Sequence, residues 1–259
     1  MKWFVMTMQH WVNAGLAILL SATTAGGVQF GAAQQSQRGD LEYDGRFTFV
    51  RLRWGSDLGF SRRGGFGSAW NHDYPRAERH LSLILEELTA LNIHTDGSLI
   101  LPLDDPELFR YPVAFMWEPG FWNLSDREAA AFRAYLLKGG FAVFEDFDGP
   151  SQWSVFEAQM RRVLPEGRLV RLDQTHPIFD TFFRIQDINA IVHPMTGIAP
   201  SYYGIFEDND PSQRLMVIAN FDNDVPEYWE WSGEGLYPFD ASNEAYKLGV
   251  NYIIYGLTH

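Results

Sequence analysis

Acidic residues follow three apolar runs of the sequence, and their type and position could support chemistry. The runs are VAFMW (113–117), FAVF (141–144) and LMVIA (215–219). The acids that follow them are Glu118, Glu145, Asp146, Asp148, Asp222 and Asp224. If the runs are parallel strands, these acids share one edge of the sheet, which is where open α/β sheets bind ligands. Clustered carboxylates can do acid–base work when one pKa is raised, or hold Ca²⁺ or Mg²⁺ through oxygen ligands.

A structural interpretation explains the same acids without any chemistry. Asp148 stands two residues before Pro150, where a helix is predicted to begin, so its side chain is expected to cap that helix. The neighbouring acids would then be strand ends in water. Several aromatic residues lie near the same strand ends, where they could stack on a sugar or fill the core. They are Trp117, Phe121, Trp122, Tyr228, Trp229 and Trp231. Both interpretations stay open.

A second polar group is the segment NHDY (71–74). His72 beside Asp73 is a general-base arrangement if the ring reaches a substrate, whereas capping of the next helix by Asp73 explains the same residues. His176 precedes Pro177, and no pair of histidines has the spacing of a zinc motif. A metal held jointly by His72, His176 and a strand-end carboxylate remains geometrically open.

The glycine-rich segment 55–69 follows a predicted strand and precedes a helix, which is where phosphate-binding loops lie. Trp70 stands where a dinucleotide fingerprint needs Gly or Ala, and no G-K-[ST] follows, so both nucleotide motifs fail. Arg62 and Arg63 could neutralise an anion in this loop, or they could be solvated. The sequence thus names no cofactor and leaves only a divalent cation open.

Alternating apolar patterns predict the elements that position these residues. Strands are expected at 47–54, 99–103, 113–117, 141–144, 169–172, 202–206 and 215–219. Helices are expected at about 75–91, 125–139, 150–164 and 242–257. Ser125 and Glu128 form a predicted capping box, and Gly139 ends that helix. Strands separated by helices predict an α/β fold with three layers and a largely parallel sheet, in a single domain over residues 46–259.

Composition limits the class of protein and its location. The chain has 259 residues and a formal net charge of -13, which argues against a nucleic-acid partner. It has no cysteine, so a disulfide or a cysteine nucleophile is excluded. Residues 1–33 are predicted to be a signal peptide, since no charge occurs between Lys2 and Arg38, and residues 34–45 form a short irregular lead-in. The alternative is an uncleaved membrane anchor, which would be the only membrane contact. Either way the domain is expected outside the cytoplasm, periplasmic or secreted.

Many separate segments carry a resemblance to one family. They include FTFVRLR (47–53), WNHDYPRAE (70–78), LFRYPVAFMW (108–117), LLKGGFAVFEDF (136–147), FEAQMRRVLP (156–165), THPIFDTFF (175–183), YYGIFEDN (202–209), RLMVIANFDND (214–224) and YKLGVNYIIYGLTH (246–259). On these segments the chain resembles the DUF4159 family. The resemblance implies a fold similar to the class I glutamine amidotransferase-like superfamily, a flavodoxin-like sandwich. It also implies an exported or membrane-associated bacterial protein, but no reaction.

Amidotransferase chemistry is not expected, because the chain lacks the cysteine nucleophile and has no G-x-S-x-G serine elbow. Two hypotheses remain, of which the sequence favours the first and leaves the second as the alternative. The first is a non-catalytic extracytoplasmic binding or assembly module, with an envelope protein or glycan as partner. The second is a carboxylate- or metal-dependent hydrolase that acts on an envelope glycan or peptide. Acids that lie close together in a pocket would favour the hydrolase, and scattered exposed acids would favour the module.

Overall fold

A seven-stranded sheet organises residues 41–55 and 69–259, which are the residues that the computed structural model describes. The strands are β1 (Val50–Arg53), β2 (Leu99–Pro102), β3 (Val113–Trp117), β4 (Phe141–Phe147), β5 (Val170–Arg171), β6 (Ser201–Phe206) and β7 (Leu215–Phe221), in the order β2-β1-β3-β4-β7-β6-β5. The pairs from β2 to β7 are parallel, and β6 is antiparallel to both of its neighbours. The predicted signal segment and the loop with Arg62 and Arg63 lie outside the described residues.

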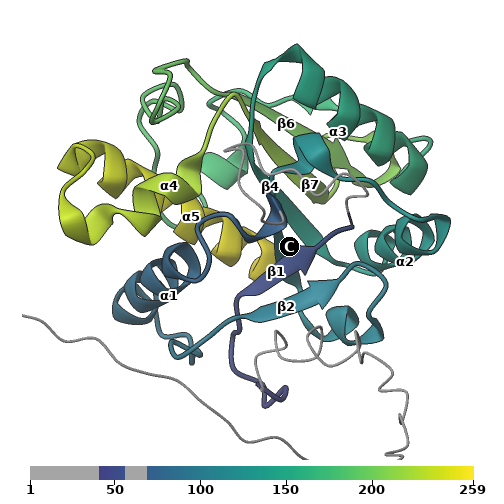
Figure 1. The fold of residues 1–259 in the computed structure, drawn as a ribbon, viewed down its shortest axis with the longest axis horizontal. Helices are drawn as coiled ribbons and strands as arrows, with labels where there is room; N and C mark the ends of the chain where they lie inside the picture. The colour runs from purple at the N-terminus through teal and green to yellow at the C-terminus, as the bar shows by residue number, and fades with distance from the viewer. Residues whose placement is uncertain (1–40, 56–68) are drawn as a thin grey trace, which may run out of the picture. The chain divides into compact units, whose positions relative to one another are not determined.

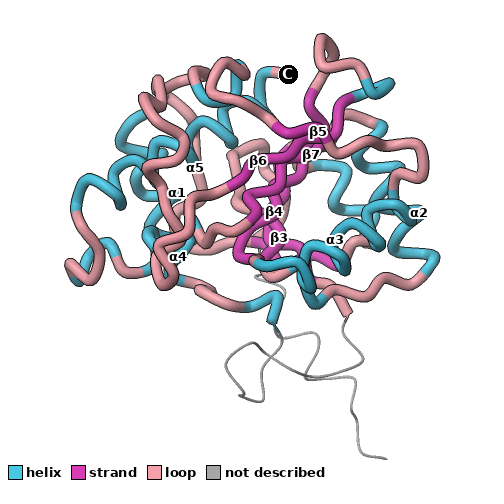
Figure 2. Tube along the Cα trace, turned by 90° about the horizontal axis from the view of Figure 1, so that it is seen from above, coloured by secondary structure: helices cyan, strands magenta, loops and turns pink. Residues whose placement is uncertain are grey.

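Helices lie on both sides of this sheet (Figures 1 and 2). They are α1 (Arg76–Leu88), α2 (Asp126–Leu137), α3 (Gly149–Val163), α4 (Val225–Glu230) and α5 (Phe239–Thr258). Figure 2 shows α1, α4 and α5 on one side of the strands and α2 and α3 on the other. Each side has its own cluster of buried apolar side chains. The prediction of an α/β domain with a mostly parallel sheet is confirmed, and the short helix α4 was not predicted.

The central strands β3 and β4 are apolar over almost their whole length because both of their faces are covered. All residues of both strands are buried, as expected for parallel strands between helices. β4 extends three residues beyond its apolar run and ends at Phe147, so it includes Glu145 and Asp146. Its pairing with β7 shifts register between Phe144 and Phe147. Such bulges often lie beside functional sites, where they redirect a side chain.

The ends of α2 follow the sequence prediction. The Ser125 hydroxyl accepts a hydrogen bond from the Glu128 amide at 3.2 Å, and the Glu128 carboxylate accepts one from the Ser125 amide at 2.8 Å. The helix ends before Gly139, whose φ of 111° suits glycine far better than other residues.

The two predicted aspartate caps are not formed. Pro75 occupies the N-cap position of α1, and Asp73 instead accepts a hydrogen bond from the Trp117 indole at 2.9 Å. Asp148 does occupy the N-cap position of α3, but its side chain makes no capping bond and accepts one from the Gln152 amide at 2.9 Å. The capping predictions for both aspartates are therefore wrong, because nearby side chains compete for their carboxylates.

We expect Gly139→Ala to lower the free energy of unfolding by about 1 kcal/mol, because an alanine at positive φ is strained. Gly233→Ala is the matched control, since a Cβ at either glycine would meet open space and only Gly139 has a positive φ. The control should change stability by less than about 0.5 kcal/mol. Urea denaturation of both variants measures the difference, and equal stabilities would contradict the assigned end of α2.

Candidate functional site

Six carboxyl groups are buried at the carboxyl edge of the sheet. They are Asp73, Glu118, Glu145, Asp146, Asp224 and Glu227, each at most 5% exposed. These six groups together with His72 are called the acidic site below. The interpretation as solvated strand ends is wrong for these six acids, because their side chains are almost completely removed from water. Asp148 and Asp222 are only half-buried and lie at the start of α3, where the Gly149 amide donates to Asp222 at 2.9 Å.

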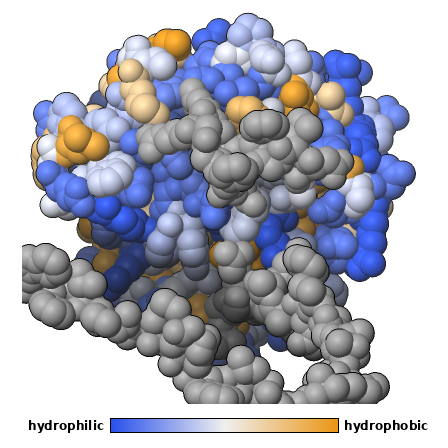
Figure 3. Space-filling model, viewed as in Figure 1, coloured by the Kyte–Doolittle hydropathy of each residue, from blue (hydrophilic) through white to orange (hydrophobic). Residues whose placement is uncertain are grey.

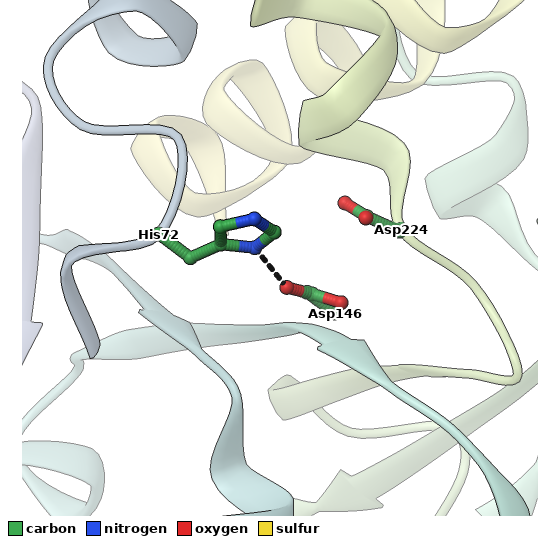
Figure 4. A group of neighbouring side chains, drawn as sticks. All are labelled: His72, Asp146 and Asp224. Carbon is green, nitrogen blue, oxygen red and sulfur yellow. Dashed lines mark hydrogen bonds and ion pairs between the residues drawn. The ribbon is translucent and has the colours of Figure 1, made fainter. Parts of the chain in front are cut away.

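His72 lies at the centre of the acidic site and retains some contact with solvent. Its side chain is 21% exposed, and its Nδ1 lies 2.6 Å from an oxygen of Asp146 (Figure 4). The same nitrogen is 3.8 Å from Glu118, and Nε2 is 3.5 Å from Asp73. One imidazole therefore contacts three carboxylates, from the segment before α1 and from the ends of β3 and β4.

A buried arginine fixes the backbone that carries His72. Arg51 of β1 is fully buried, forms an ion pair with Glu78 of α1, and stacks 3.4 Å from the ring centre of Trp117. Its guanidinium also donates to the carbonyls of Trp70 at 3.0 Å and His72 at 2.7 Å. Sequence reasoning missed this residue, although a charged residue between apolar strand residues signals a specific partner.

Four aspartate or glutamate residues near this edge have a left-handed backbone. The φ angles of Asp73, Glu118, Asp146 and Asp222 lie between 50° and 60°. This conformation is uncommon outside glycine and costs free energy, and it concentrates at functional sites. Aspartate tolerates this conformation better than most residues, and the exposed Asp208 also adopts it, with a φ of 53°.

Asp224 brings an unsatisfied oxygen into the acidic site. One oxygen caps α4 by accepting from the Glu227 amide at 3.2 Å. The other is buried and has no hydrogen-bond partner in the described part of the chain. In Figure 4 the carboxylate points toward His72 and Asp146. One possible ligand atom from each of these three residues lies within 4.8 Å of the others, as holds also for His72, Asp73 and Glu227. Such spacing suits a bound metal ion.

Burial and crowding shift the protonation of these groups. Burial raises the pKa of Asp73 to about 8 and raises the pKa values of Glu145 and Asp224 well above those of ordinary carboxyl groups. Burial by itself would lower the pKa of His72. The hydrogen bond to Asp146 and the neighbouring negative charges outweigh that effect and raise the pKa of His72 to about 9. The cation-free site therefore retains protons to limit its negative charge.

His176 lies away from the acidic site. Its Nδ1 accepts a hydrogen bond from the Ile178 amide at 3.2 Å, and its ring packs 5.6 Å from that of Phe206. A metal site shared by His72 and His176 is therefore not formed.

The sequence analysis did not identify Glu227 as a site residue. Glu227 stands three residues after Asp224, and this spacing is typical of a helix N-cap followed by an acid in the first turn of the helix.

The fold and the site define a mixed α/β protein with a buried histidine–carboxylate centre at the carboxyl edge of its sheet. The family model of DUF4159, a domain of unknown function, matches residues 48–257, so the chain belongs to this family. No curated protein matches the chain. Among the described residues, none of the helices is long and apolar enough to cross a membrane.

The cation-free protein should become less stable as the pH rises from 7 to 9. The folded state holds protons on His72 and Asp73 up to about pH 9 and 8, whereas the unfolded chain releases them near 6.5 and 3.8. The folded state then binds more protons than the unfolded state. The free energy of unfolding therefore falls by up to about 1.4 kcal/mol per pH unit for each additional proton that the folded state holds. His176 has a lowered pKa and titrates below this range.

Urea denaturation in a chelator at pH 7, 8 and 9 measures this slope. His72→Gln should reduce it, because the variant has no imidazole to titrate. A free energy of unfolding that rose over the same range would contradict the described protonation.

Proposed function

We propose that the acidic site binds a divalent cation and that the protein is a metal-dependent hydrolase. The observation that carries this proposal is the buried oxygen of Asp224, which has no hydrogen-bond partner among residues 41–55 and 69–259 and faces His72 and Asp146. A buried carboxylate oxygen without a partner is costly, and coordination of a cation would remove that cost.

The ligand types narrow the identity of the cation. One imidazole nitrogen combined with carboxylate oxygens suits Mn²⁺ or Zn²⁺ better than Mg²⁺ or Ca²⁺, which both prefer a shell of oxygens. With His72, Asp146 and Asp224 as three protein ligands, a position would remain for water or substrate, which is typical of catalytic metal sites. The exposed part of His72 gives this position contact with solvent.

Hydrolysis follows from the chemistry that such a cation supplies. A bound divalent cation lowers the pKa of a water ligand and polarises a carbonyl or phosphoryl oxygen. Asp73 lies 3.5 Å from His72 and has a raised pKa, so its carboxyl group could act as proton donor or acceptor beside that water. No cysteine takes part, because the chain has none.

The proposal also includes a more specific fold class and a location outside the cytoplasm. A mostly parallel sheet with helices on both sides supports a three-layer, flavodoxin-like arrangement similar to the class I glutamine amidotransferase-like superfamily. The uncharged segment between Lys2 and Arg38 supports export. On this basis the substrate is a glycan or peptide of the cell envelope.

A non-catalytic binding or assembly module is the second candidate. The observation in its favour is the absence of cysteine from a chain whose family resembles cysteine-dependent amidotransferases in fold. On this view an envelope protein or glycan is the partner, and the acidic site serves only to hold β3, β4 and β7 in place.

We expect millimolar Mn²⁺ to raise the melting temperature of the wild type by about 5 to 10 °C relative to chelator. At a hundredfold excess over Kd, a cation adds about 2.7 kcal/mol, and each kcal/mol shifts a domain of this size by about 2 to 4 °C. Asp224→Asn should lose this shift, because an amide is a poor replacement for an anionic ligand. Differential scanning fluorimetry with Mn²⁺, Zn²⁺ and Mg²⁺ measures the effect.

Asp208→Asn is the matched control. Asp208 is exposed, has a φ of 53° like the site residues, and lies outside the acidic site, so this variant should keep the full cation shift. A shift that is absent from the wild type, or equal in Asp224→Asn, would favour the module. Release of reducing ends or amino groups from purified envelope polymers by the Mn²⁺-loaded protein then tests hydrolysis, with Asp224→Asn as the inactive reference.

The mature protein is expected to begin near Gln34 and to be found outside the cytoplasm. The small residues Gly31, Ala32 and Ala33 precede this position and form a suitable cleavage site. Amino-terminal sequencing of the protein from fractionated cells checks both statements. Recovery of Met1 in the membrane fraction would instead support an uncleaved anchor.

A further inference from the structure

A cavity of about 610 Å³ lies beside the start of α5, and none of the six acids of the acidic site lines it. Its apolar wall is formed by Ile84, Leu88, Phe183, Tyr237, Phe239 and Tyr246. Two of these side chains are largely in water, since Phe239 is 81% exposed and Leu88 is 46% exposed. Figure 3 shows apolar side chains at the left edge of the molecule, where the segment around the start of α5 lies in Figure 1.

Most polar groups of this wall are already bonded within the protein. The Lys247 ammonium is paired with Glu244 at 2.5 Å, and the hydroxyls of Ser232 and Tyr246 are 2.6 Å apart. The Tyr237 hydroxyl donates a hydrogen bond to a carboxylate of the acidic site. A ligand would therefore be recognised through apolar and aromatic contacts, and a charged ligand would find no free counter-ion among these groups.

We infer that this cavity is a binding site for an uncharged, apolar small molecule, such as an aromatic ring system or a short acyl chain. Its volume lies within the range of small-molecule pockets, which is roughly 300 to 1,000 Å³. A protein partner would instead need about 800 Å² of well-packed surface. Binding would remove part of Phe239 and Leu88 from water, which favours the bound state.

One side chain links the cavity to the acidic site. Tyr237 lines the cavity, and its hydroxyl donates to Glu227 at 2.8 Å. Glu227 in turn has an oxygen within 4.8 Å of possible ligand atoms of His72 and Asp73. A molecule in the cavity is thus one hydrogen bond away from the acidic site.

The experiment is a fluorescence titration of the full chain with the uncharged probe N-phenyl-1-naphthylamine in the presence of chelator. The wild type should show saturable fluorescence enhancement. Leu88→Lys should weaken binding at least tenfold, because an ammonium in the wall would have to be desolvated. Leu83→Lys is the matched control: Leu83 lies on the same helix, is 41% exposed and does not line the cavity, so its affinity should stay within twofold.

Thermal unfolding of each variant verifies that it is folded, and Phe239→Lys provides a second test at the most exposed position of the wall. Absence of saturable binding to the wild type would overturn the inference. Equal loss in the Leu88 and Leu83 variants would also overturn it, since the probe would then bind elsewhere. Because the titration is done without metal, its failure is distinct from a failure of the cation proposal.

Discussion

The concentration of negative charge at the carboxyl edge of the sheet is the constraint that the rest of the structure must satisfy. Six carboxyl groups are buried at this edge and three of them contact one imidazole, and burial of an ionised carboxylate away from water is costly unless another charge or a proton offsets it. Raised pKa values show how the cation-free protein limits the cost, by keeping protons on Asp73, Glu145 and Asp224. A bound cation would offset the same charge without protons. The arrangement is unfavourable for folding alone, which is why a functional origin explains it best.

Arg51 enables the chain to maintain this arrangement. Its ion pair with Glu78 ties β1 to α1, and its bonds to the carbonyls of Trp70 and His72 hold the intervening segment against the sheet. Removal of one partner from such a buried pair typically costs about 3 to 5 kcal/mol. The charge of Arg51 also opposes the rise in the pKa of Asp73, although burial of that carboxyl has the larger effect. The buried ion pair thus supports the acidic site both through the backbone and through its charge.

The sequence predicts the fold well where apolar periodicity dominates. The runs at β3, β4 and β7 and the Ser125 capping box are local signals, and the structure confirms them. For the acidic site, the sequence predicted only that the acids which follow the strands share one edge of the sheet. Whether its acids face water or each other depends on left-handed residues such as Glu118 and Asp146, which no local pattern reveals. Asp73 failed as a predicted cap for a related reason, because the Trp117 indole from a distant strand takes its carboxylate.

Helix α4 connects the acidic site to the apolar cavity, and helix α1 connects the Arg51 ion pair to the same cavity. Helix α4 begins at Asp224 in the acidic site, and its Glu227 holds the Tyr237 hydroxyl at the cavity wall. Helix α1 carries Glu78 near its start and Leu88 of the cavity wall at its end. The two helices also pack on each other, since the His80 ring bonds to the Trp229 carbonyl at 2.8 Å. A displacement of α4 by a ligand in the cavity would therefore move Asp224 relative to His72. If a cation binds between these residues, the cation and the occupant of the cavity would influence each other's affinity through this helix, since such coupling is reciprocal.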